Sequence, residues 1–243
     1  MDKTGRIVVT SEKPSPRDLQ EYITWVLTQE AGTNPVDDDV GERAAQNQGK
    51  YHIWFLPGAT SHKDTLHRTC TVPADTELLI LAATSDSSYL EHVGARDDEH
   101  LLEIAKRIAE LHRDVKITIK DIDDEASLKT YEIKDAKNRQ QGELELVIAD
   151  AFPIVIPKNN IYKRLYGVKG GYTHIAAVAW GIKIKLKRGK YIVTMEAHHD
   201  QVMGFEVLGL KFDVPSFNLN IEYEITAIEE KQALKLPFAN YPQ

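Results

Sequence analysis

The segment Phe217–Ile228 alternates apolar and polar side chains along its length. The apolar set is Phe217, Leu219, Ile221, Tyr223 and Ile225, and the polar set is Asn218, Asn220, Glu222, Glu224 and Thr226. Because successive side chains of a strand point to opposite faces, this pattern predicts an antiparallel strand with one buried face and one wet face. Such a strand needs further strands beside it and a second layer over its apolar face.

Much of the remaining chain consists of short apolar runs bounded by turn residues, which are typical of further strands. The runs are Tyr51–Leu56, Leu78–Ala82, Lys116–Ile119, Glu143–Ile148, Ile154–Ile156, Ala176–Leu186 and Tyr191–Met195. Arg188 and Gly189 separate the last two runs and predict a hairpin. Pro153 predicts a turn between Glu143–Ile148 and Ile154–Ile156.

Two segments have helical periodicity instead. We expect one helix near residues 16–30, where Ser15 can cap the N-terminus and Pro16 suits the first turn. A second is expected near residues 98–113, which begins with acidic residues and ends with basic ones, as the helix dipole favours.

The order of these elements indicates the fold class. Many short strands without regular β-α-β alternation predict a mainly β fold, an antiparallel, jelly-roll-like β-sandwich with two flanking α-helices. The chain has 243 residues and no low-complexity linker, so residues 1–243 are expected to form a single domain.

The charge and the composition of the chain limit the classes of partner and the cellular compartment that we expect. The formal net charge of −7 argues against binding to nucleic acid or to anionic membranes. No apolar run approaches the roughly 20 residues that span a bilayer, and the first residues lack the layout of a signal peptide. The single cysteine, Cys70, excludes an internal disulfide. We therefore expect a cytoplasmic protein, and exposed strand edges leave room for a homo-oligomer.

Several short motifs between about residues 22 and 91 are similar to those of a known family. EYITWVL (21–27) matches a tryptophan-bearing helix, WFLPG (54–58) matches WFLAG, and residues 68–74 match RxCTVPA. A segment NPxxDxTGxxCAxGQ is matched at Asn34, Pro35, Asp38, Gly41, Glu42 and Gln48. Asp86 holds an acidic position that follows. The chain thus resembles a family of bacterial and archaeal proteins, mostly secreted, with no assigned biochemical function, and the similarity is looser after residue 91.

This chain departs from the resemblance at cysteine positions. The family has cysteines where this chain has Ala44 and Ser87, and only Cys70 remains. Their loss fits a reducing interior, where a disulfide contributes nothing. We interpret Cys70 as the remnant of a framework that is now a small apolar residue in a strand. A nucleophilic role would need a nearby histidine, and His67 lies off the alternation that would share a face with Cys70.

The loop NPVDDDVGE (34–42) has four carboxylates in six positions beside turn residues. Its candidate metal ligands are Asp37, Asp38, Asp39 and Glu42. Carboxylate and carbonyl oxygens are the ligands that Ca²⁺ prefers, although the loop does not match an EF-hand. Adjacent aspartates are more often a solvated loop. A third interpretation is a buried ion pair between Arg68 and Asp38, Glu42 or Asp86.

The segment MEAHHDQ (195–201) offers a second metal interpretation. His198 and Asp200 share a strand face with Glu196, and His-x-Asp spacing occurs in iron sites with two histidines and one carboxylate. His174 could be the remote ligand. We favour the alternative, a solvent-exposed hairpin end.

Two other patterns have ordinary structural explanations. The basic stripe of Lys183, Lys185, Lys187, Arg188 and Lys190 could receive a polyanion, but such stripes more often solubilise a sheet face. The tryptophans Trp25, Trp54 and Trp180 could stack on sugars. Trp25 and Trp54 lie in core-like patterns, so burial is the expectation.

No short signature of a known catalytic class is present in the sequence. We therefore expect a non-catalytic binding or assembly module with a structural cation such as Ca²⁺ in the loop 34–42. Its loops 34–42, 57–68 and 84–90 are expected to meet at one end of the sandwich. The alternative is a carboxylate- or metal-dependent hydrolase that acts on a glycan or a small ester. Its candidate catalytic residues are Asp38, Glu42, Arg68 and Asp86. A pocket that holds a carboxylate with a shifted pKa would favour this alternative.

Overall fold

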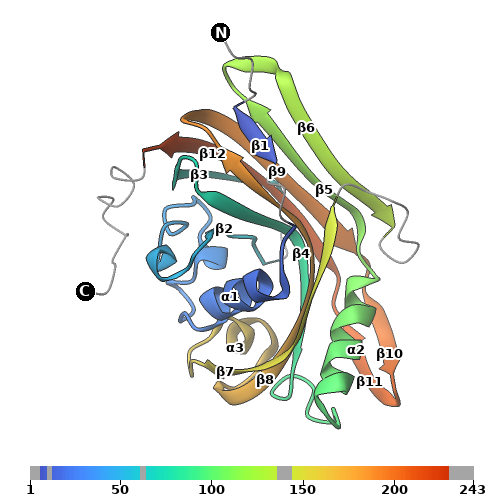
Figure 1. Cartoon of the computed structure of the whole chain (residues 1–243). Coiled ribbons are helices and arrows are strands. Elements are labelled where there is room, and N and C mark those ends of the chain that lie inside the picture. The colour runs from blue at the N-terminus through green and yellow to red at the C-terminus, as the bar shows by residue number, and fades with distance from the viewer. Residues whose placement is uncertain (1–5, 10–12, 61–63, 136–143, 230–243) are drawn as a thin grey trace.

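The computed structural model describes residues 6–9, 13–60, 64–135 and 144–229 (Figure 1). Strands dominate these residues, and they form two five-stranded sheets and a separate two-stranded hairpin. Helices flank the sheets. The fold is therefore mainly β, and the predicted β-sandwich with flanking helices is confirmed.

The first sheet is built around its longest strand, β8 (Gly171–Leu186). On one side, β8 pairs with β4 (Glu77–Ser88), and β4 pairs in turn with the short parallel strand β2 (Trp54–Leu56). On its other side, β8 pairs with β7 (Glu145–Ile156) and β1 (Ile7–Val9), both antiparallel.

The second sheet has the predicted strand Phe217–Ile228 near its edge. In order, its strands are β3 (Leu66–Pro73), β12 (Phe217–Ile228), β9 (Gly189–His199), β5 (Arg113–Asp121) and β6 (Asp124–Asp135). Only the pair β3–β12 is parallel. Leu219, Ile221, Tyr223 and Ile225 of β12 are buried, which confirms the alternation. The strands β10 (Val202–Val207) and β11 (Leu210–Val214) form the separate hairpin.

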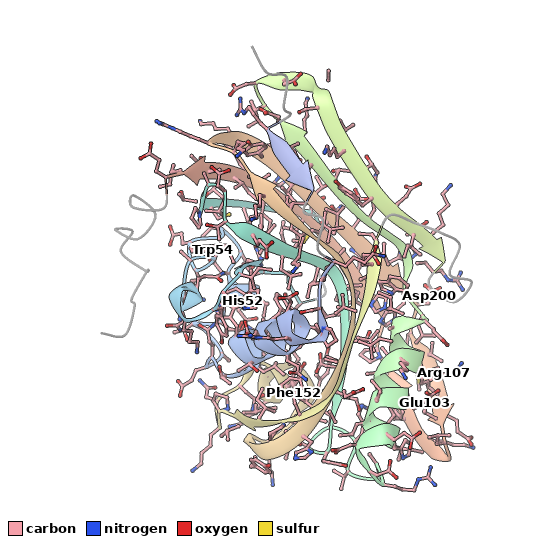
Figure 2. The ribbon with its side chains drawn as sticks, viewed as in Figure 1. His52, Trp54, Glu103, Arg107, Phe152 and Asp200 are labelled. Carbon is pink, nitrogen blue, oxygen red and sulfur yellow. The ribbon has the colours of Figure 1, made fainter. Side chains whose placement is uncertain are left out.

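The main hydrophobic core lies between the two sheets. The first sheet contributes Trp54, Leu56, Ile80, Ile182 and Ile184, and the second contributes Ile117, Val193, Met195, Ile221 and Tyr223. Figure 2 shows Trp54 within the body of the molecule, and its exposed fraction is 6%. Trp25 is also buried, as predicted, and Trp180, for which burial was not predicted, is buried as well.

Helices cover both faces of the first sheet. The helix α1 (Pro16–Leu27) and the short helix α3 (Ile161–Tyr166) lie on one side of β4, β7 and β8, and α2 (Asp98–Ala109) lies on the other (Figure 1). Short 3₁₀ turns occur at Pro35–Asp37 and Gln48–Lys50.

The predicted caps explain where the helices begin. Ser15 Oγ accepts a hydrogen bond from the Asp18 backbone N–H, and the Asp18 carboxylate accepts one from the Ser15 backbone N–H, a complete capping box. Both long helices end a few residues before the predicted boundary. For α2 the reason is that β5 begins at Arg113. The helix α3 was not predicted, because six residues give too short a periodic pattern.

Two predicted local features differ from the structure. The expected turn at Pro153 is absent, and β7 runs through this position with a register shift between Ala149 and Phe152. A strand that pairs on one side only can accommodate a proline at such an irregularity. Glu143, the start of the predicted run, lies outside the described residues.

The second predicted feature that differs from the structure is the position of Lys183. This residue was expected on a wet face with the rest of the basic stripe, but its side chain is 5% exposed, and its Nζ lies 3.3 Å from Asp18 Oδ2. The reason is that α1 covers the sheet face to which Lys183 points.

In the part of the chain that the structure describes, no helix is long and apolar enough to cross a membrane.

Candidate functional site

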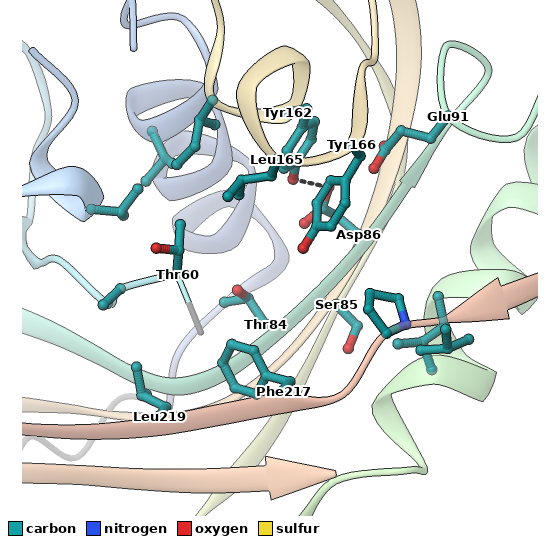
Figure 3. A pocket seen from close by; sticks show the side chains of 18 of the residues that line it. Thr60, Thr84, Ser85, Asp86, Glu91, Tyr162, Leu165, Tyr166, Phe217 and Leu219 are labelled. Atoms are coloured by element: carbon teal, nitrogen blue, oxygen red, sulfur yellow. Dashed lines mark hydrogen bonds between the residues drawn. The ribbon is translucent and has the colours of Figure 1, made fainter. Parts of the chain in front are cut away.

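A cavity of about 410 Å³ opens along one edge of β4. The parallel strand β2 pairs only with Leu78–Ile80, whereas β4 continues to Ser88. Over the described residues, β4 therefore has no strand partner on this side beyond Ile80. The walls come from α1, α3, the end of α2 and the connection between β11 and β12 (Figure 3).

A bulge in β4 stands where the cavity begins. The register of β4 against β8 shifts between Leu81 and Ala83. Gly181 of β8 lies opposite, and a Cβ atom there would stand 2.3 Å from the Ile80 carbonyl oxygen. Only glycine permits this close approach, so Gly181 helps to fix the path of β4 at the cavity.

One end of the cavity holds two carboxyl groups. Asp86 of β4 accepts a short hydrogen bond from Tyr162 Oη of α3, and Glu91 Oε2 accepts one from Ser88 Oγ at 2.7 Å. Figure 3 shows Asp86, Glu91, Tyr162 and Tyr166 gathered at this end. We call these four residues the acidic end of the cavity.

Burial shifts the proton affinities of the acidic end. It raises the pKa of Asp86 to about 6, although the hydrogen bond from Tyr162 opposes the rise. Burial, followed by the charge of Asp86, raises the pKa of Glu91 well above its ordinary value. The same two causes raise the pKa values of Tyr162 and Tyr166. Both carboxyl groups therefore hold a proton more tightly than ordinary Asp and Glu side chains, which suits either cation binding or proton transfer.

The other end of the cavity is aromatic. The His112 ring lies edge-on to His199, with ring centroids 5.0 Å apart, and Phe217 stacks on His199 at 5.8 Å. Burial lowers the pKa of His112 to about 4 and also lowers the pKa of His199. Each Nδ1 faces a backbone carbonyl oxygen, of Ala109 and of Asp200. Since a carbonyl only accepts, both imidazoles donate through Nδ1, and these two rings are neutral at neutral pH.

The four candidate catalytic residues do not converge. Asp86 lies in the cavity, whereas Glu42 is exposed on the acidic loop. Arg68 is buried, and its guanidinium donates to the carbonyl oxygens of Gly58 and Val36 at 2.8 and 3.2 Å. In the described chain it has no carboxylate within 4.0 Å, so the predicted ion pair with Asp38, Glu42 or Asp86 is absent.

The carboxylates of the acidic loop (residues 34–42) have different partners and do not meet at one point. Asp38 accepts hydrogen bonds from the backbone N–H groups of Val40 and Arg43, at 3.2 and 2.5 Å. Asp37 pairs with Arg164 of α3 at 2.5 Å. The remaining two carboxylates of the loop, Asp39 and Glu42, are exposed. Among the residues with described positions, no group of three or more His, Cys, Asp or Glu side chains is placed to hold a metal ion.

We expect Asp38→Asn to lower the free energy of unfolding by about 1 kcal/mol in the presence of EDTA, because a charged acceptor for two N–H groups is lost. Asp39→Asn, one residue away and exposed, is the matched control and should change little. Thermal melts with and without CaCl₂ check both expectations. A rise with calcium in the wild type that Asp38→Asn abolishes would establish the predicted calcium site instead.

The second metal prediction falls at the C-terminal end of β9, the central strand of the second sheet. His198 is half-exposed, and its Nε2 lies 3.9 Å from Asp114 Oδ2. Asp200 is exposed beyond the end of β9, on the α2 side of the molecule and away from His52 and α1 (Figure 2). The proposed remote ligand His174 hydrogen-bonds Asp98 through Nδ1, at 2.9 Å.

Cys70 lies on β3, partly buried against the main core. Burial raises the pKa of its thiol to about 12, so the thiol is protonated at neutral pH. This agrees with its interpretation as a small apolar residue and leaves no thiolate nucleophile there.

Glu91 and Tyr162 belong to the cavity but were not singled out from the sequence. Glu91 follows Asp86 by five residues in a loop, where no periodicity relates them. Tyr162 lies 76 residues away on the short helix α3. The available signal was the pair of caps on that helix, Asn160 at its start and Gly167, with φ of 75°, at its end.

Comparisons with known proteins do not place the chain in a family. No protein-family model, no curated protein and no solved structure matches it.

Proposed function

We propose that this chain is a binding protein for a small organic molecule with an apolar body, which it takes into the cavity beside β4. The observation that carries the proposal is a cavity of about 410 Å³ with mainly apolar walls and one polar end. This volume and this composition are typical of ligand sites, in which apolar walls supply affinity and a few polar groups fix orientation.

The apolar walls are pre-formed by packed secondary structure. Ile23 and Val26 come from α1 and Leu165 from α3, and Phe217 and Leu219 come from the start of β12. Each residue belongs to an element whose other face packs into the core or onto the sheet. Rigid walls lower the entropy that binding must overcome, which favours a binding role for the cavity.

A hydrolase is the second candidate, and one observation favours it. The pKa of Asp86, at about 6, suits a general acid or base near neutral pH, and Glu91 supplies a second carboxyl group. The mainly apolar walls suit a small ester better than a glycan, whose hydroxyl groups need many polar partners. Release of nitrophenol from nitrophenyl butyrate that disappears in Asp86→Asn would support this candidate.

The binding proposal predicts that the neutral apolar dye N-phenylnaphthylamine binds saturably to the wild type and is blocked by Thr84→Phe. Thr84 is partly exposed on β4 and faces the cavity (Figure 3), so a phenyl ring there fills space that the dye needs. We expect a loss of at least about tenfold in dye affinity, which corresponds to about 1.4 kcal/mol. Fluorescence titration measures it.

The matched control is Thr130→Phe on β6, where the threonine is exposed and is not among the residues that line the cavity. It adds the same ring to a strand and should leave dye binding unchanged. Equal dye binding by the wild type and Thr84→Phe, with both proteins folded by circular dichroism, would contradict the proposal, and so would a fluorescence rise that does not saturate.

A further inference from the structure

We propose that the ligand carries a cationic head, a primary amine or a related ammonium group, that sits between Asp86 and Glu91 while its apolar body fills the rest of the cavity. This inference rests on the proposed function, because it names the chemical class of the molecule that the cavity takes.

The charged side chains that line the cavity all have the same sign. Its lining includes three carboxylate side chains, Asp86, Glu91 and Asp213, and among the described residues that line it there is no lysine or arginine. The histidines at the aromatic end are neutral, as shown above. A cavity lined by carboxylates, with no cationic side chain among its described lining residues, complements a molecule with one positive head and an apolar body.

The two carboxyl groups have hydrogen-bond donors but no counter-charge. Tyr162 donates to Asp86, and Ser88 donates to Glu91. Neither carboxylate has a basic side chain within 4.0 Å in the described chain. Burying two carboxylates without a cation is unfavourable, and the raised pKa values of Asp86 and Glu91 report this cost. A bound ammonium group would supply the missing charge and up to three donors.

An unpartnered hydroxyl group gives independent support for a ligand. Ser85 is 4% exposed and lines the cavity, and its Oγ has no hydrogen-bond partner among the described residues. Ser85 and Asp86 are neighbours in β4, so their side chains leave the strand on opposite sides, and the cavity wraps around the free edge between them (Figure 3). A buried hydroxyl group without a partner is unfavourable, and a polar group on the ligand would satisfy it.

Aromatic rings line the part of the cavity in which the cationic head and the apolar body of the ligand would lie. The rings of Tyr162 and Tyr166 have centroids 6.1 Å apart at the acidic end, and Phe217 lines the cavity further along. The face of such a ring attracts an ammonium group and its neighbouring methylene groups. A bare metal ion lacks an apolar body, and calcium requires six to eight oxygen ligands, which two carboxyl groups do not provide.

The test uses three probes that share a phenyl ring on a four-carbon chain and differ in the polar group at the end of that chain: phenylbutylamine, phenylbutanol and phenylbutyrate. Isothermal titration at about pH 7.5 should rank the amine above the alcohol by at least about tenfold, and the carboxylate last. Asp86→Asn, which still accepts from Tyr162, should weaken the amine by about tenfold or more and the alcohol by less than about threefold. Asp150→Asn on the exposed part of β7 is the matched control and should change neither.

The outcomes separate this inference from the proposed function. If the alcohol binds as tightly as the amine and Thr84→Phe blocks both, the binding proposal stands and the cationic head is wrong. If none of the three probes binds and the dye does not bind, the proposed function fails as well. Amine binding that Asp86→Asn leaves unchanged would overturn the inference, and so would binding of calcium chloride alone with the same sensitivity to Asp86→Asn.

Discussion

Arg68→Ala is expected to lower the free energy of unfolding by about 3–5 kcal/mol. Arg68 is 1% exposed, and its guanidinium connects three parts of the chain. Nη1 donates to the Gly58 carbonyl oxygen and to Tyr223 Oη, both at 2.8 Å, and Nη2 donates to the Val36 carbonyl oxygen at 3.2 Å. Removing it leaves these acceptors buried without donors and opens a cavity of several methylene groups.

The expected loss of stability is large because the groups around the Arg68 guanidinium are neutral carbonyl and hydroxyl groups whose oxygen atoms point at it. The guanidinium lies over the Tyr223 ring, with its central carbon 5.7 Å from the ring centroid, and Tyr223 Oη donates onward to the Pro57 carbonyl oxygen at 2.9 Å. Carbonyl oxygens converge on a cation that has no carboxylate partner in the described chain. Without the cation, the carbonyl groups of the acidic loop and of the segment after β2 lose their common donor.

Urea denaturation followed by tryptophan fluorescence measures the change, with the slope against urea as a check on two-state behaviour. Arg68→Lys keeps the charge but loses the planar fork, so an intermediate loss of about 1–3 kcal/mol is expected. Arg113→Ala, at an exposed position on β5, controls for the loss of an arginine and should stay within about 0.5 kcal/mol of the wild type. A loss at Arg68→Ala no larger than that at Arg113→Ala would refute this account.

Arg68 also shows what could be read from the sequence and what could not. The alternation of β12 and the caps of α1 are local patterns, and both predicted their elements correctly. Arg68 was singled out because it lies in a motif. Its partners could not be predicted, because carbonyl oxygens carry no residue type, and an arginine near many aspartates suggests ion pairs instead. The backbone hydrogen bond from Thr69 N–H to the Val40 carbonyl oxygen brings the acidic loop to β3, and it leaves no trace in the sequence.

The cavity was still less predictable. Asp86 was singled out by its position in a motif, but its meaning depends on Glu91 and Tyr162, which the packing of α3 and the loop after β4 bring to it. The free edge of β4 arises because β2 has only three residues. Local residue patterns predict which segments become strands, whereas the length mismatch of two neighbouring strands is a property of the assembled sheet.

Asp86→Asn is expected to raise the free energy of unfolding by about 2–3 kcal/mol at about pH 7.5, while it removes the acceptor proposed for a cation. Burial raises the pKa of Asp86 to about 6 from an ordinary value near 3.8. In the folded protein, Asp86 therefore binds a proton more tightly than in the unfolded chain. Ionising Asp86 above pH 6 costs folding free energy, and asparagine avoids this cost while its amide oxygen still accepts from Tyr162.

The sign of the pH dependence follows from the same shift. Between about pH 4 and pH 6 the Asp86 carboxyl group binds more protons in the folded protein than in the unfolded chain, so its contribution to stability becomes less unfavourable as the pH falls through this window. The advantage of Asp86→Asn should be full above pH 6, shrink below it and vanish near pH 4. Loss of the Asp86 charge should also bring the raised pKa of Glu91 toward its ordinary value, which adds to the gain.

Other titrating groups face the same cavity, and the comparison is designed to cancel them. Tyr22, Tyr162 and Tyr166 have raised pKa values and stay neutral throughout the window. The buried histidines His92 and His112, with pKa values lowered to about 4, destabilise the folded state as the pH falls, but they do so equally in wild type and variant. The difference between the two urea midpoints at each pH therefore isolates Asp86 and Glu91.

Asp150→Asn on the exposed part of β7 removes one negative charge without altering the cavity, so its stability difference from the wild type should be near zero and flat with pH. If Asp86→Asn destabilises the protein at about pH 7.5, then Asp86 is an ordinary ionised carboxylate with a structural role. If it stabilises the protein by the same amount at pH 4, the gain does not come from the ionisation of Asp86, and this account is wrong. If Asp86→Asn is more stable than the wild type and no longer binds the amine, then the wild type keeps the Asp86 and Glu91 carboxyl groups although they lower its stability. A cost of that kind is expected where a buried charge serves a ligand rather than the fold.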